Sequence, residues 1–131
     1  MALPNGAGGY QLGDGNLNEV VLETSATPTA YTAGVTLTTA DLAGGIVVYT
    51  SSSTANLALP TAAATDAAFS SAKPYSAFDI SLIATSTGVP TITAGTGWTL
   101  VGVGTGVASK SVLFRAVKTG DASWSLYRIA G

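Results

Sequence analysis

The sequence contains no cysteine and no histidine among its 131 residues. Without cysteine the chain forms no disulfide, and thiol catalysis and cysteine-ligated metal sites are excluded. Without histidine it lacks the commonest general base, the commonest transition-metal ligand and any Ser-His triad. We therefore predict that the chain is not an enzyme and has no catalytic, cofactor-binding or metal-binding residues.

Charge is also scarce. Charged residues make up 9% of the chain and the net charge is −2, whereas an average soluble domain is about 25% charged. No basic stripe is present that would neutralise phosphates or bind a membrane surface, so neither nucleic acid nor membrane is an expected partner. No apolar run approaches the roughly 20 residues of a spanning helix, and the first residues lack the basic and apolar regions of a signal peptide.

The residues that are abundant are Ala, Thr, Gly, Ser and Val. Such a chain covers its surface with hydroxyls and small apolar groups instead of ions. One interpretation is a threonine-rich β surface facing water. The other is a surface buried against copies of itself or other subunits, since isolated proteins usually carry more charge.

Period-two alternation between turn residues predicts an all-β fold. Residues 1–18, rich in Gly and Asn, read as an extended N-terminal arm, and 19–131 as one β-sandwich domain, jelly-roll-like, although a short barrel has the same alternation. One short helix is expected near 61–69 and a helical turn at 39–45. Because no long helices alternate with the strands, a parallel α/β sheet is not expected. The expected strands cover 19–24, 35–38, 45–50, 55–60, 77–84, 90–93, 97–102, 111–118 and 123–129.

Several local contacts are also predicted. The polar turn at 51–54 predicts a hairpin between its two flanking strands, and "TGD" at 119–121 a tight turn with Gly120 at positive φ. Asp66 fits the first turn of the predicted helix, where its charge favours the helix dipole. Asp79 lies within a strand and needs a partner, either Arg115 or Arg128.

The segment "GTGVASKS" at 104–111 resembles a phosphate-binding P-loop, except that Ser109 replaces the second glycine. A P-loop needs a helix after the glycines, so that backbone N–H groups and the helix dipole meet the phosphate. The residues that follow alternate with period two and predict a strand. We therefore interpret this segment as a connection between strands.

The aromatic residues lie mostly at alternating strand positions, which favours core packing. Tyr10, Tyr31 and Tyr75 fall in the arm or in loops and are better interface candidates. A carbohydrate-binding module would instead expose two or three coplanar aromatic rings.

Four segments, "LPTAAATDAAF" (59–69), "AFDISLIATS" (77–86), "GTGWTLVG" (95–102) and "FRAVKTG" (114–120), make residues 35–131 similar to small virion proteins of tailed bacteriophages. The chain resembles their capsid decoration, or cement, proteins. The same motifs also fit a head-fibre base or a tail-associated β domain of that lineage.

This resemblance implies a β-sandwich protomer that forms a homotrimer on the outer surface of an icosahedral capsid. It also implies that the N-terminal arm contacts the major capsid protein. The expected interface residues are Leu3, Tyr10 and Leu12 of the arm and Tyr31 of the first loop. The alternative function is a phage fibre or head-surface module that recognises host glycans.

Overall fold

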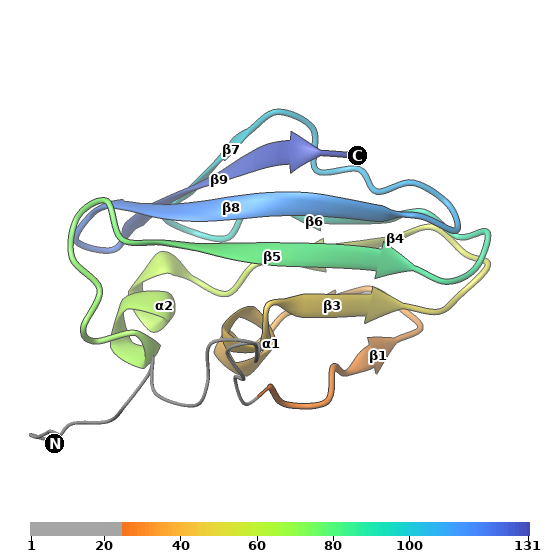
Figure 1. The fold of residues 1–131 in the computed structure, drawn as a ribbon, viewed down its shortest axis with the longest axis horizontal. Helices are drawn as coiled ribbons and strands as arrows, with labels where there is room; N and C mark the ends of the chain where they lie inside the picture. The colour runs from red at the N-terminus through yellow and green to blue at the C-terminus, as the bar shows by residue number, and fades with distance from the viewer. Residues whose placement is uncertain (1–24) are drawn as a thin grey trace, which may run out of the picture.

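The computed structural model describes residues 25–131, which form two β-sheets and two short helices (Figure 1). The larger sheet has six strands in the order β1-β3-β5-β8-β9-β7. These strands are β1 (Ala30–Tyr31), β3 (Ile46–Tyr49), β5 (Ala77–Ala84), β8 (Ser111–Gly120), β9 (Ser123–Ala130) and β7 (Trp98–Val101). The smaller sheet has the order β2-β4-β6, with β2 (Val35–Thr36), β4 (Ala55–Ala58) and β6 (Pro90–Thr93).

The first six strands alternate between the two sheets. Strands β1, β3 and β5 join the larger sheet, and β2, β4 and β6 join the smaller one. Within each sheet, each of these strands pairs in parallel with the strand two places before it in the chain. The chain therefore winds like a short coil, and parallel neighbours need a crossover between them. Two of these crossovers carry the helices, α1 (Thr39–Gly44) before β3 and α2 (Ala62–Ala68) before β5.

The C-terminal half of the larger sheet is built differently. Strand β8 runs antiparallel to β5 and to β9, and β7 pairs with β9 in parallel at the sheet edge. The two long strands β8 and β9 thus join the edge strand β7 to the parallel coil.

Both helices begin at threonine caps. Thr38 accepts a hydrogen bond from the backbone N–H of Asp41, and the Asp41 side chain accepts one from the N–H of Thr38, which makes a capping box. Helix α1 ends at its C-cap Gly45, whose φ of 74° is the left-handed conformation that favours glycine. Thr61 caps α2 in the same way as Thr38, through the N–H of Ala64.

The hydrophobic core lies between the sheets and beneath the helices. It combines inward residues of the larger sheet, such as Tyr49, Leu82 and Phe114, with Leu57 and Ile92 of the smaller sheet. No helix in the described part of the chain is long and apolar enough to cross a membrane.

The prediction of a mainly β protein with two sheets is confirmed, and so is the helix near 61–69. A jelly-roll sandwich is not confirmed, because jelly rolls are antiparallel whereas the first half of this chain pairs in parallel. The parallel pairing of the first six strands was not predicted, because the sequence shows no long helices between strands, and here helices of six and seven residues are sufficient.

Two local predictions also fail. The strands that flank residues 51–54 do not form a hairpin, because β3 and β4 belong to different sheets. In the β8–β9 turn the positive φ, 48°, falls on Ala122 and not on Gly120. The expected strand at 19–24 lies outside the described residues.

Candidate functional site

Three of the four predicted interface residues, Leu3, Tyr10 and Leu12, lie outside the residues that the structure describes. Tyr31 ends β1 and is half-buried against the core. Its hydroxyl donates a hydrogen bond to the Asp41 carboxylate of α1. Burial, together with this hydrogen bond and the nearby negative charge, raises the pKa of Tyr31 to about 12. Part of the Tyr31 side chain therefore serves the fold, and its role at an interface stays a prediction.

The P-loop-like segment connects strands, as predicted. Gly106 donates its N–H to the carbonyl of Pro90 at 2.7 Å, and Ser109 donates to Ser86 at 2.9 Å. Ser109 has a φ of 57°, and β8 begins two residues later at Ser111. No helix N-terminus follows the glycines, so the backbone is not arranged to hold a phosphate.

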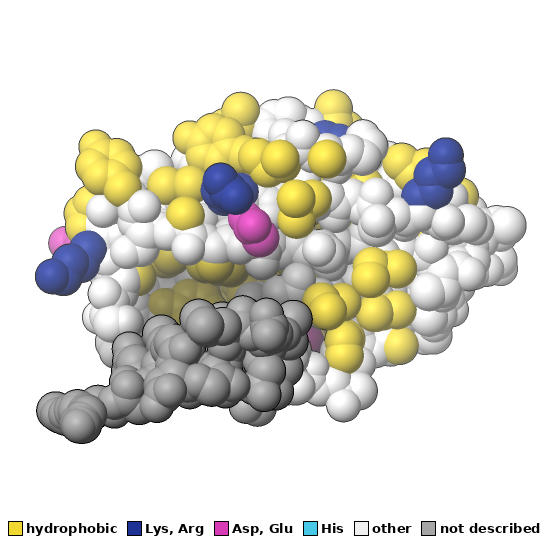
Figure 2. Space-filling model, in the orientation of Figure 1, with side chains coloured by type: hydrophobic (Ala, Val, Ile, Leu, Met, Phe, Trp, Pro, Cys, Tyr) yellow, Lys and Arg dark blue, Asp and Glu magenta, His cyan; other side chains and the backbone are white. Residues whose placement is uncertain are grey.

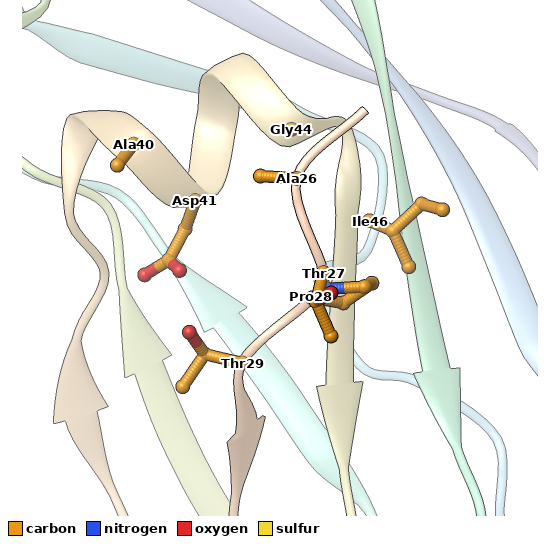
Figure 3. A pocket seen from close by; sticks show the side chains of 8 residues that line it. All are labelled: Ala26, Thr27, Pro28, Thr29, Ala40, Asp41, Gly44 and Ile46. Carbon is orange, nitrogen blue, oxygen red and sulfur yellow. The ribbon is translucent and has the colours of Figure 1, made fainter. Parts of the chain in front are cut away.

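A shallow cavity of about 220 Å³ lies between residues 26–29, α1 and the start of β3 (Figure 3). Its charged lining residue is Asp41, and one oxygen of this carboxylate accepts hydrogen bonds from both Thr38 and Tyr31. The remaining lining is short apolar groups and threonines. Within residues 25–131 no group of three or more acidic side chains could hold a metal ion.

A buried polar cluster joins α2 to the β8–β9 hairpin. The ammonium of Lys118, a residue only 7% exposed, lies 3.1 Å from Asp66 and 3.3 Å from the carbonyl of Ala72. Asp66 also accepts from the Trp124 indole at 2.8 Å and the Ala122 N–H at 2.6 Å. These donors, the Ala122 N–H foremost, hold the pKa of Asp66 below its usual range. The cluster anchors α2 to the β8–β9 hairpin. Asp66 lies beyond the first turn of α2, so the prediction that it belongs to the first turn of this helix was wrong.

The most distinctive surface is the side of the six-stranded sheet that points away from the three-stranded sheet. Here we call it the outer face. Its register brings apolar side chains of five strands together: β3 residues pair with β5, β5 with β8, β8 with β9, and β9 with β7. Figure 2 views the molecule from this side and shows hydrophobic side chains spread over it. The burial patterns and registers of the strands place these larger apolar residues on the outer face: Ile46, Val48, Ile83, Leu113, Val117, Tyr127, Val101 and Ile129.

Several of these side chains are strongly exposed. Ile129 is 52% exposed, Val101 45% and Tyr127 36%. Exposed antiparallel sheets usually present polar residues to water on the side away from the core, and parallel sheets are usually covered on both sides. The outer face is mixed: Asp79, Ser81 and Arg115 are polar, as this pattern predicts, whereas β7 and β9 carry large apolar groups towards solvent.

An ion pair lies within the outer face. Asp79 of β5 and Arg115 of β8 are direct neighbours in register, with Nε to Oδ1 at 2.8 Å and Nη2 to Oδ2 at 3.4 Å. The Arg115 guanidinium holds the pKa of Asp79 below its usual range, and Asp79 raises the pKa of Arg115. Both side chains are about half exposed, so the pair adds little to the stability of the isolated chain. This contact confirms Arg115 as one of the two partners predicted for Asp79.

The outward side of the three-stranded sheet has the opposite character. Its β2, β4 and β6 strands present Thr36, Asn56, Thr91 and Thr93. Polar side chains of this kind are usual on the side of a sheet that faces water. The two sides of the molecule therefore differ: one presents small polar side chains, and the other combines polar residues with large exposed apolar ones.

The sequence contained one signal for the outer face. Residues 77–84 were expected to place Ala77, Asp79, Ser81 and Ile83 on one side, and the structure does so. What sequence reasoning missed was that neighbouring strands add further apolar groups on the same side. That requires the strand order, which the alternation of one strand does not contain.

A comparison with known proteins finds no matching family model, no matching curated protein and no matching solved structure. The resemblance to capsid decoration proteins therefore rests on the sequence motifs alone.

Proposed function

We propose that this chain is a virion structural protein that decorates the head of a tailed bacteriophage. In this proposal it binds on the outer surface, between major capsid protein subunits, as a homotrimer. The observation that carries the proposal is the outer face, an apolar sheet surface on a chain of unusually low charge. A cement protein stabilises a shell by adding buried interface area at many equivalent positions, and this requires such a surface.

The alternative, recognition of host glycans, requires coplanar exposed aromatic rings. Both tryptophans are buried and stack on each other with centroids 5.6 Å apart. Of the described aromatic residues, the most exposed is Tyr75, at 82%. It lies in the connection before β5, whereas Tyr127 lies on β9. Among residues 25–131, therefore, no pair of exposed, coplanar aromatic rings favours this alternative.

The test is binding to heads assembled without the protein. Purified chain is mixed with undecorated heads, unbound protein is removed by sedimentation, and bound copies are counted by gel densitometry. We expect saturable binding and a higher temperature of head disruption. Heads that stay bare at high micromolar protein would overturn the proposal.

A chain without residues 1–12 separates the roles of the arm and the domain. We expect it to keep the far-UV circular dichroism of the full chain but to lose binding to heads, because Leu3, Tyr10 and Leu12 are predicted arm contacts. If the shortened chain still decorates heads, the arm is not the anchor.

A further inference from the structure

We infer that the outer face of the six-stranded sheet is the surface through which copies of this chain associate. The occupant is a second copy, and the Asp79–Arg115 pair of one copy meets that of the next. This inference deepens the proposed function and rests on it. Because the same face of two copies meets, the contact is twofold, and it is separate from the contacts around the threefold axis of the proposed homotrimer.

The first argument is the difference between the two sides of the molecule. Val101 and Ile129 project from β7 and β9 with about half of their surface in water, while the three-stranded sheet shows threonines and an asparagine. Apolar surface that is removed from water on association stabilises the complex in proportion to its area. The side that gains from being covered is therefore the outer face.

The second argument is area. Six strands spaced about 4.8 Å apart span about 24 Å, and the eight residues of β5 extend about 26 Å. The shorter edge strands reduce the covered surface to about 500–600 Å² for each copy. Two such faces bury about 1,000–1,200 Å² in total, which reaches the lower end of specific protein interfaces.

The third argument is charge, which selects a second copy over an arbitrary partner. The outer face combines one acidic and one basic side chain, so two such faces meet without net repulsion. Arg115 uses two of its five N–H donors on Asp79 of its own chain. A symmetric contact brings Arg115 of one copy to Asp79 of the other, which adds charge-assisted hydrogen bonds on both sides.

The first experiment measures the mass of the full chain in solution by light scattering from about 1 to 200 μM. We expect a defined oligomer. Val101→Lys with Ile129→Lys places charges on the outer face at positions where the single chain tolerates them, because both are exposed. This double variant should weaken association at least tenfold and yield folded monomers. Ile83→Lys tests the β5 part of the same face.

Thr36→Lys with Asn56→Lys is the matched control, because it adds the same two charges at exposed positions on the outward side of the three-stranded sheet. It should leave the oligomer intact. A monomeric wild-type chain at 200 μM would overturn the inference. So would outer-face variants that are folded by circular dichroism and still associate like the wild type.

A second experiment tests the contact between ion pairs. Asp79→Arg combined with Arg115→Asp keeps the pair within the chain but reverses it. When this chain is mixed with wild type, a symmetric contact would bring like charges together, so the two should sort into separate oligomers. Native mass spectrometry measures the species, and statistical mixing would refute contact between the pairs.

The two levels of the argument fail separately. A wild-type monomer that nevertheless decorates heads removes the association through the outer face but leaves the proposed function. An oligomer that dissociates with the outer-face variants, but never binds heads, supports the association and removes the decoration role.

Discussion

Two buried tryptophans that contact each other differ in one hydrogen bond. Trp98 and Trp124 are 7% and 1% exposed, and their rings stack 5.6 Å apart. The Trp124 N–H donates to Asp66 at 2.8 Å, whereas the Trp98 N–H is buried without a partner. Replacing each tryptophan by phenylalanine removes the same atoms from neighbouring positions of the core.

The unpaired N–H decides the difference in cost. Both replacements lose a similar amount of packing, so this loss cancels when the two are compared. A buried donor without a partner costs about 1–3 kcal/mol, and Trp98→Phe removes that cost. Trp124→Phe relieves no unpaired donor, and it removes the hydrogen bond that the Trp124 indole donates to Asp66. We expect Trp98→Phe to be the more stable variant by at least about 1 kcal/mol, or about 3–5 °C in Tm for a chain of this size.

The assay is urea unfolding followed by far-UV circular dichroism, because fluorescence would report a different tryptophan in each variant. Equal m-values for the two variants ensure that the midpoints compare stability and not compactness. The double variant gives the coupling between the two rings, which are in contact and therefore not additive. Equal stabilities, or a less stable Trp98→Phe, would refute the reasoning.

Further predictions concern pH and two glycines. The pKa of Tyr31, raised to about 12, favours the protonated phenol in the folded state. The stability that this provides is complete below pH 10, the ordinary tyrosine value, and is lost as the pH rises through about 12. Tyr31→Phe should remove a tyrosine that titrates at about pH 12 from an absorbance titration at 295 nm and leave this alkaline loss of stability smaller. Asp66 has a lowered pKa, so its contribution is present above the usual aspartate value and is lost as the pH falls below it. Asp66→Asn should flatten the acid limb of stability against pH, measured by urea midpoints, and an unchanged limb would contradict the assignment. Gly104→Ala should cost about 1–3 kcal/mol, because its Cβ would collide with a β6 carbonyl oxygen. Gly120→Ala, with open space around it, is the control and should be close to neutral in the same urea assay.

Strand existence was predictable from this sequence, and strand partners were not. Alternation within a segment such as 77–84 follows from burial on one side of that segment, so it is readable locally. The parallel pairing of β1, β3 and β5 depends on where the chain returns after each crossover. Strands of two to four residues carry too few side chains for their pattern to specify a neighbour.

In helix α2, too, the local features were predictable from the sequence and the long-range contacts were not. Thr61 before an alanine-rich run predicted α2, because the cap and the helix are adjacent in sequence. The role of Asp66 was predicted wrongly from that local pattern. Its partners Lys118, Ala122 and Trp124 lie more than fifty residues away and meet it only in the folded chain.

Predicting the outer face would have required both the local apolar pattern of each strand and the order of the strands in the sheet. Apolar residues on the side of a strand that faces away from the core favour burial on that side too, and Leu113 and Val117 of β8 are such residues. The fold covers one side with the three-stranded sheet and leaves the other to solvent. Selection for a protein that acts alone would replace such residues with polar ones at little structural cost, as on the opposite sheet with Thr91 and Thr93. We therefore expect the outer face to be covered when the protein acts, as the inferred association of copies requires.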